Sequence, residues 1–235
     1  MEPIIKVNRL VQKIGSRPLL QGISFEVLPG EWWGVFGARG AGKTSLLHIL
    51  AGIDSFTSGQ VEILGSNIRK SAQFKRKLGL VTEENSMFID LTVVENLDFI
   101  AALKEATRDD VQEMAERFEL REFLPEPVTA LKSGVLQRLA LACAVLNRPR
   151  LLLVDDVINQ IDFYSRQLLL RELQQFQAAG GTCVCVFSAI DFSRYVTRVA
   201  WLAEGELSVY EPADARAEWH RQEKLYRKQS ERDHV

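Results

Sequence analysis

Residues 37 to 45 form the segment of this sequence best suited to chemistry. They read Gly-Ala-Arg-Gly-Ala-Gly-Lys-Thr-Ser, which fits the P-loop pattern G-x4-G-K-T. Glycines let backbone N–H groups converge on phosphate oxygens, the lysine reaches the β and γ phosphates, and the threonine supplies a ligand for Mg²⁺. The complete pattern predicts binding of ATP and Mg²⁺ rather than a mere glycine-rich turn. The residues expected to hold the nucleotide are Gly37, Ala38, Arg39, Gly40, Ala41, Gly42, Lys43, Thr44 and Ser45.

Two adjacent carboxylates follow an apolar run farther along the chain. The run Leu-Leu-Leu-Val at residues 151–154 precedes Asp155 and Asp156. A buried strand here would deliver Asp155 toward Mg²⁺ and Asp156 toward an attacking water. Taken alone, the segment fits a strand with an acidic turn equally well, but together with the P-loop it favours a metal site. We therefore expect Thr44 and Asp155 to bind Mg²⁺ and Asp156 to act as the catalytic base.

Alternating strand and helix patterns surround these segments. Apolar, β-branched runs predict strands at 4–11, 23–27, 32–36, 59–64, 78–81, 151–154 and 182–187, and helical spacing predicts helices at 45–50, 93–124, 136–146 and 164–178. Strands that alternate with helices imply an α/β fold with a largely parallel sheet. The long helical pattern in the middle of the chain indicates a helical subdomain.

Composition limits the class of protein. The 235 residues are 46% hydrophobic and 26% charged with a net charge of -2, as in an ordinary soluble globular domain, and no basic excess indicates nucleic acid. The amino terminus lacks a signal-peptide pattern, and no apolar run approaches the roughly 18 residues that span a bilayer. We expect Cys143, Cys183 and Cys185, which lie in apolar segments, to be core residues in a reducing compartment.

The segment from Leu131 to Asp156 adds a more specific pattern. It contains Leu-Lys-Ser-Gly-Val-Leu-Gln-Arg ending at Arg138, then a helix rich in small residues, Pro149 and the acidic strand. This order resembles the ATP-binding cassette (ABC) ATPases, whose signature reads L-S-G-G-Q followed by a basic residue and Gln-Arg. The resemblance extends over nearly the whole chain, to about Tyr210.

The resemblance implies a fold and an assembly. The fold would be a P-loop NTPase core with a mainly parallel sheet, an antiparallel β subdomain and a helical subdomain at about 83–140, within one domain of residues 1–212, followed by a charged tail at 213–235. In this family two cassettes enclose two ATP molecules and drive a separate transmembrane permease. The chain is accordingly expected in the cytoplasm, at the inner face of the membrane. The positions expected to contact the partner's nucleotide are the signature residues Lys132, Ser133, Gly134 and Val135, and Asp162 falls at the D-loop position of the family.

Several positions depart from the family pattern. Glu83 stands where the family has Gln; it is a candidate metal ligand and, with Asp156, a candidate catalytic residue. Asp156 replaces the catalytic Glu and is one methylene shorter, so its carboxylate could lie about 1 Å from the productive position, at a cost of ~10²-fold in rate. The switch histidine is missing from the region that contains Ser188. The adenine-stacking aromatic expected near Ile14 is also missing, which predicts weaker base binding.

The leading interpretation is an ABC transporter subunit that couples Mg-ATP binding and slow hydrolysis to a membrane partner. The alternative is a catalytically impaired cassette that controls assembly through nucleotide occupancy. A soluble role in DNA repair or translation is less favoured, because tandem cassettes and long coiled-coil insertions are missing, and a P-loop kinase would leave the signature segment unexplained. The tail, dense in both charges, predicts a solvated helix or a frayed end, with docking to a partner as an alternative.

Overall fold

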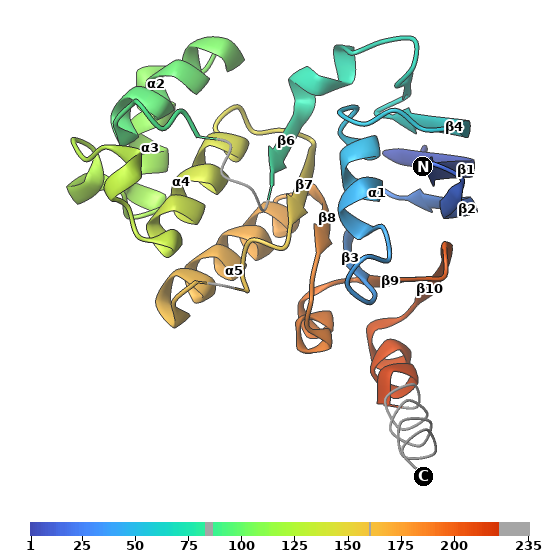
Figure 1. Cartoon of the computed structure of the whole chain (residues 1–235). Coiled ribbons are helices and arrows are strands. Elements are labelled where there is room, and N and C mark those ends of the chain that lie inside the picture. The colour runs from blue at the N-terminus through green and yellow to red at the C-terminus, as the bar shows by residue number, and fades with distance from the viewer. Residues whose placement is uncertain (83–86, 160, 221–235) are drawn as a thin grey trace.

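The computed structural model describes residues 1–82, 87–159 and 161–220, and it contains two β-sheets (Figure 1). The first sheet is antiparallel, with the order β2-β1-β4-β5. The second has the order β10-β9-β3-β8-β7-β6 and is parallel except for the β9–β10 pair. The strands are β1 Ile5–Ile14, β2 Arg17–Val27, β3 Trp32–Phe36, β4 Ser58–Ile63, β5 Ser66–Asn67, β6 Leu78–Val81, β7 Leu151–Asp155, β8 Thr182–Val186, β9 Arg198–Ala203 and β10 Glu206–Tyr210.

The centre of the larger sheet is apolar throughout. Every residue of β3, β7 and β8 is buried, as expected for parallel strands covered on both faces. The predicted α/β fold with a largely parallel sheet and a separate antiparallel sheet is confirmed.

Helix α1, Lys43–Leu50, lies between the two sheets (Figure 1). Its Leu46, Leu47, Ile49 and Leu50 are buried in one apolar cluster together with side chains of both sheets. The helix ends at Leu50 with Ala51 as its C-cap, and the next residue, a glycine, takes a left-handed φ of 66° that most side chains disfavour. The P-loop therefore leads into a helix that is fixed on two sides.

A helical region lies at the opposite side of the larger sheet from the antiparallel sheet (Figure 1). It contains α2 Val93–Lys104, α3 Arg108–Arg117 and α4 Ser133–Val145, with short 3-10 turns at Arg121–Phe123 and Val128–Ala130. Capping boxes start α2 and α3, because Thr92 and Thr107 each exchange hydrogen bonds with the acidic residue three positions later. Helix α4 runs past residue 140, the expected end of the helical subdomain. In the described part of the chain, no helix has the length and apolar character needed to cross a membrane.

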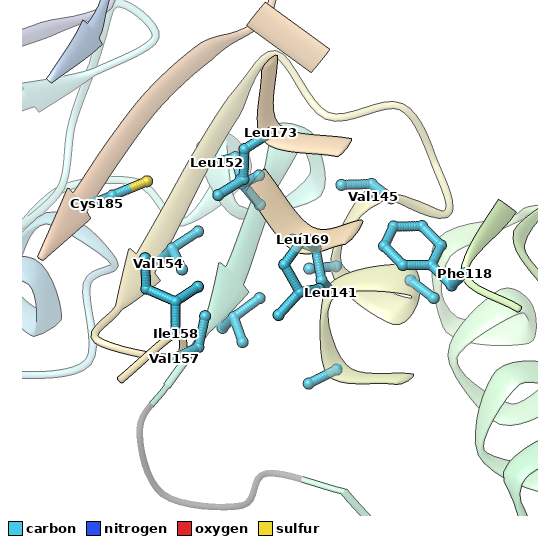
Figure 2. Packing of buried hydrophobic residues seen from close by; sticks show 14 of the residues in the cluster. Phe118, Leu141, Val145, Leu152, Val154, Val157, Ile158, Leu169, Leu173 and Cys185 are labelled. Carbon is cyan, nitrogen blue, oxygen red and sulfur yellow. The ribbon is translucent and has the colours of Figure 1, made fainter. Parts of the chain in front are cut away.

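One core joins this helical region to the sheet (Figure 2). Helix α5, Phe163–Ala178, packs against α4 and β8, and α4 packs against β6. The side chains that meet there include Leu141 and Val145 of α4, Leu152 and Val154 of β7, and Leu169 and Leu173 of α5. The remaining 3-10 turns are Gln73–Lys77 before β6 and Ile190–Tyr195 after β8. This packing fixes α4, and with it the signature segment, relative to the strands that lead to the P-loop.

The three cysteines are free and buried, which confirms their expected place in the core. Burial raises the pKa of the Cys143 and Cys185 thiols to about 12. The Trp32 indole donates a hydrogen bond to Cys185 Sγ at 3.2 Å. These thiols are consequently protonated at neutral pH.

The start of the charged tail is a helix at residues 212–220. Ala215 is 1% exposed within the main core, and the Trp219 ring meets Trp201 edge-on with centroids 5.2 Å apart. The expected helix is confirmed for these residues, most of which are exposed or half-buried, but the two apolar side chains at i and i+4 give it one face that packs on the core. The rest of the tail lies outside the described residues.

Candidate nucleotide-binding site

The sheet order brings the predicted site residues to one edge. Strands β3, β8 and β7 are neighbours and parallel, so the segments that follow them start side by side. The P-loop follows β3, Asp156 follows β7 and Ser188 follows β8. A cleft of about 970 Å³ opens there, within the size range of small-molecule sites. Its walls, the P-loop cleft below, include Gly37, Ala38, Arg39, Gly40, Gly42, Lys43, Thr44, Ser45, Asp155, Asp156, Ser188, Ser133, Gln137, Ile14, Leu19 and Trp219.

The P-loop glycines are required by its geometry. Gly37 has a φ of 151°, and a Cβ there would lie 2.2 Å from the Leu202 carbonyl oxygen of β9. Gly42 has a φ of 102° and directly precedes α1, so the first free N–H groups of the helix face the cleft. Ala41 lines a neighbouring cleft rather than this one. A loop of this shape can wrap an anion with backbone N–H groups.

Lys43 is held by the loop itself. Its ammonium donates to the carbonyl oxygens of Gly37 at 2.9 Å and Ala38 at 3.0 Å. The positive charge is thereby kept inside the loop, where it can neutralise phosphate oxygens.

Thr44 and Asp155 lie together at the floor of the cleft. The Thr44 hydroxyl donates to Asp155 Oδ1 at 3.3 Å, and Asp155 is fully buried at the end of β7. A hydroxyl beside a buried carboxylate offers the hard oxygen donors that Mg²⁺ prefers, with phosphate and water oxygens completing the shell. This pair of residues fits the predicted metal site.

Asp156 differs from its neighbour in both conformation and partners. It is half-buried and has a φ of 42°, in the left-handed region that non-glycine residues seldom adopt. Its carboxylate accepts hydrogen bonds from the Ser188 hydroxyl and from the Asn159 side-chain amide. The sequence placed Ser188 in the switch region but gave no sign of this contact, and it gave none for Asn159. The side chain that should activate water is therefore oriented by a hydroxyl and an amide.

The four signature residues have different surroundings. Lys132 and Ser133 are exposed at the start of α4, and Ser133 reaches the P-loop cleft of its own chain. Gly134 and Val135 are buried, with Val135 in the main core. Their expected contact with a partner's nucleotide stays a prediction.

Asp162 caps α5 next to the signature. Its carboxylate accepts from the Ser165 backbone N–H at 2.9 Å, and this hydrogen bond holds the pKa of Asp162 below its ordinary value. A Cβ on Gly134 would lie 2.1 Å from the same carboxylate. The D-loop and the signature thus touch within one chain.

Glu83, the remaining candidate, lies outside the described residues.

These features define a P-loop nucleotide-binding protein with a helical region inserted between the phosphate loop and the acidic strand. Residues 20–159 match the ABC transporter family, and the chain belongs to that family. A spermidine/putrescine import ATP-binding protein of Bacillus cereus is 32% identical over 75% of this chain, and one of Legionella pneumophila is 31% identical over 74%. A probable multidrug ABC transporter ATP-binding protein of Escherichia coli is 28% identical over 88% of this chain.

The curated relatives are longer proteins. The chain matches 49% of the Legionella pneumophila protein, 55% of the Bacillus cereus protein and 36% of the Escherichia coli protein, so it spans about half of their length or less.

Solved structures agree on the fold. An ATP-binding subunit of an ABC transporter superposes with a TM-score of 0.85 at 20% identity, covering 96% of this chain and 98% of that one. A dimeric cassette bound to ADP and Pi gives 0.82 at 24% identity, covering 88% and 98%.

Proposed function

We propose that this chain is the ATP-binding subunit of an ABC transporter and that it hydrolyses Mg-ATP slowly. The observation that carries the proposal is the hydrogen bond from Thr44 to Asp155 beneath the P-loop. It joins the residue that opens the phosphate-binding helix to the acidic strand, as a site for a metal-bound triphosphate requires.

The residues of the chain have separate tasks in this function. Backbone N–H groups of the P-loop and the Lys43 ammonium bind the phosphates, and Thr44 and Asp155 hold Mg²⁺. When bound, Mg²⁺ neutralises charge on the phosphate oxygens. Asp156 orients and deprotonates the attacking water, and Glu83 is a further candidate for a metal or water contact.

Slow turnover follows from the length of the Asp156 side chain and from the missing switch histidine. Asp156 is one methylene shorter than the Glu that the resemblance places at this position, which leaves its carboxylate about 1 Å from the productive position. No histidine stands in the switch segment after β8, so no imidazole there can take or give a proton. A cassette that keeps its phosphate-binding residues but has a misplaced catalytic base would bind ATP normally and hydrolyse it slowly. The same features support the second candidate, a cassette that regulates assembly through nucleotide occupancy.

An exposed apolar surface on the helical region suits a membrane partner. Phe88 and Phe99 are 45% and 42% exposed with ring centroids 4.6 Å apart, and Ile89 and Leu103 are 54% and 66% exposed. A contiguous apolar group of this kind indicates a protein contact. The partner in this proposal is a transmembrane permease that binds the chain at the inner face of the membrane. A second cassette would complete each nucleotide site through Lys132, Ser133 and the residues beside them.

Binding and turnover can be measured with the purified chain. We expect Mg-ATP to bind, with affinity lost in Lys43→Ala, and the stimulation of binding by Mg²⁺ to fall roughly tenfold in Thr44→Val but not in Thr44→Ser, which keeps the hydroxyl. Equilibrium binding with and without EDTA tests both. Identical binding by the wild-type chain and Lys43→Ala would contradict nucleotide binding at this site.

The transport role is tested by co-purification. We expect the chain to co-purify with a multi-span membrane protein, and Phe99→Asp to reduce the amount recovered.

A further inference from the structure

The end of the P-loop cleft away from the carboxylates carries an aromatic side chain from the tail. A second cleft, of about 980 Å³, adjoins the first and shares with it Ile14, Leu19, Ala38, Arg39 and Gly40. Lys43, Thr44 and Asp155 line only the first cleft. The shared residues therefore mark the end remote from the metal-binding pair, where the base of a nucleotide held at the P-loop would extend.

The β1–β2 hairpin offers no aromatic ring at this end. Its residues that line the P-loop cleft are Ile14, which is 66% exposed, and Leu19. Branched aliphatic side chains can contact one edge of a base, but they lack the flat polarisable face that stacks on it. Trp219 of the helix at residues 212–220 lines the first cleft, whereas its neighbour Glu218 and its ring partner Trp201 line the second, so Trp219 lies near the place where the two clefts adjoin.

The position of Trp219 is fixed by the sheet. Trp201 of β9 is the direct partner of Phe36, the last residue of β3 before the P-loop. The Trp219 ring meets Trp201 edge-on at an interplanar angle of 63°, and Ala215 anchors the same helix in the core. Figure 1 shows this helix directly below the loop that joins β3 to α1. Since the indole is only half-buried, part of its surface remains open to the cleft.

We propose that Trp219 stacks on the base of the bound nucleotide, so that the tail helix supplies the aromatic contact that the hairpin lacks. This inference rests on nucleotide binding at the P-loop. Stacking on an aromatic ring depends on the π-face that every base has, so it adds affinity without reading base identity. Trp219 thus contributes to ATP and GTP binding alike and contributes nothing to a ligand that has phosphates but no base.

A ligand that has phosphates but no base distinguishes two possible effects of replacing Trp219, loss of base stacking and loss of structural support near the P-loop. We expect Trp219→Ala in the full chain to weaken Mg-ATP and Mg-GTP binding roughly tenfold, by loss of one stacking contact, and to leave Mg-tripolyphosphate binding unchanged. Trp219→Phe keeps a ring and should retain most of the affinity. Mg-ATP should also quench the tryptophan fluorescence of the wild-type chain, and Trp219→Phe should lose most of this signal, because Trp32 and Trp33 are buried in the core and Trp201 lines only the neighbouring cleft.

The outcomes are distinguishable. Unchanged Mg-ATP binding by Trp219→Ala would overturn the inference. An equal loss of Mg-ATP and Mg-tripolyphosphate would also overturn it, since Trp219 would then only support the fold near the P-loop. If Trp219→Ala fails to fold, the same comparison is made with Trp219→Leu, which keeps an apolar contact with Trp201 but has no ring. A wild-type chain that binds neither ligand contradicts the proposed function itself.

Discussion

The Ser188 hydroxyl donates a hydrogen bond to the carboxylate of Asp156, so the segments that follow β8 and β7 are joined across the edge of the sheet. Asp156 also accepts from Asn159, three residues later in the same turn. The candidate base therefore has one partner from its own turn and one from the neighbouring strand. These two hydrogen bonds orient the carboxylate that would accept a proton from the attacking water.

Ser188→Ala tests whether this hydroxyl positions Asp156. A hydrogen bond to a charged group contributes about 1.5–3 kcal/mol, so we expect the variant to lose roughly tenfold in kcat while its affinity for Mg-ATP changes less than about twofold. Ser188→Thr keeps the hydroxyl and should remain close to wild type. Steady-state phosphate release and equilibrium binding give the two readouts. A kcat equal to that of the wild type in Ser188→Ala would show that the contact has no part in turnover.

Asp156 itself can be changed in two directions. Asp156→Asn cannot accept a proton and should lower kcat by about 10²-fold with little change in nucleotide affinity. Asp156→Glu lengthens the side chain by one methylene, the length that the resemblance to ABC ATPases assigns to this position, and we expect it to raise kcat. The measurement is phosphate release at saturating Mg-ATP. If Asp156→Glu is no faster than the wild type, side-chain length does not limit hydrolysis.

The sequence predicted the parts of the site that lie next to strand ends. The P-loop, Asp155 and Asp156 each follow a continuous apolar run, and the carboxyl ends of parallel strands meet at one edge, so their proximity could be expected from the pattern. The roles of Asn159 and Trp219 could not be predicted. They depend on a tight turn and on the packing of a charged helix, neither of which leaves a periodic signal.

Element ends were harder to predict than element centres. The strand expected at 4–11 continues to Ile14, because its pairing with β2 runs up to the turn at Gly15, where φ is 60°. The helix expected from residue 136 begins at Ser133, since packing of Gly134 against α5 holds the signature segment in helical form despite its serine and glycine. In both cases tertiary contacts override local propensity.

Gly134 is required by its contact with α5. Alanine usually stabilises a helix relative to glycine, but a Cβ here would lie 2.1 Å from Asp162 Oδ2 and 2.4 Å from Ser165 Oγ. We expect Gly134→Ala to lower the free energy of unfolding by about 1–3 kcal/mol. Lys132→Ala is the matched control, because Lys132 is exposed and its side chain makes no capping hydrogen bond. Urea denaturation followed by circular dichroism gives the comparison. Greater stability in Gly134→Ala would contradict the close approach.

Asp162 should make the stability of the chain depend on pH. Its carboxylate caps α5, so Asp162→Ala should cost about 1 kcal/mol at pH 7, while Asp162→Asn, which keeps an acceptor oxygen, should cost less. The hydrogen bond from Ser165 lowers the pKa of Asp162 in the folded chain. The ionised Asp162 therefore makes its full contribution to the free energy of unfolding above the unfolded pKa, about 3.9. This contribution disappears as the pH falls through the lower pKa of the folded chain.

Urea midpoints of the wild type and Asp162→Ala at pH 7 and near pH 3 measure this dependence. The difference between the two chains should be largest at pH 7 and should narrow in acid, because protonation weakens the carboxylate as an acceptor for the Ser165 N–H. Asp162→Asn has no charge to lose, so its difference from Asp162→Ala should stay constant over the same range. If the urea midpoints of the wild type and Asp162→Ala differ by the same amount at both pH values, the charge of Asp162 does not contribute to the cap. Any acceptor oxygen would then suffice at this position.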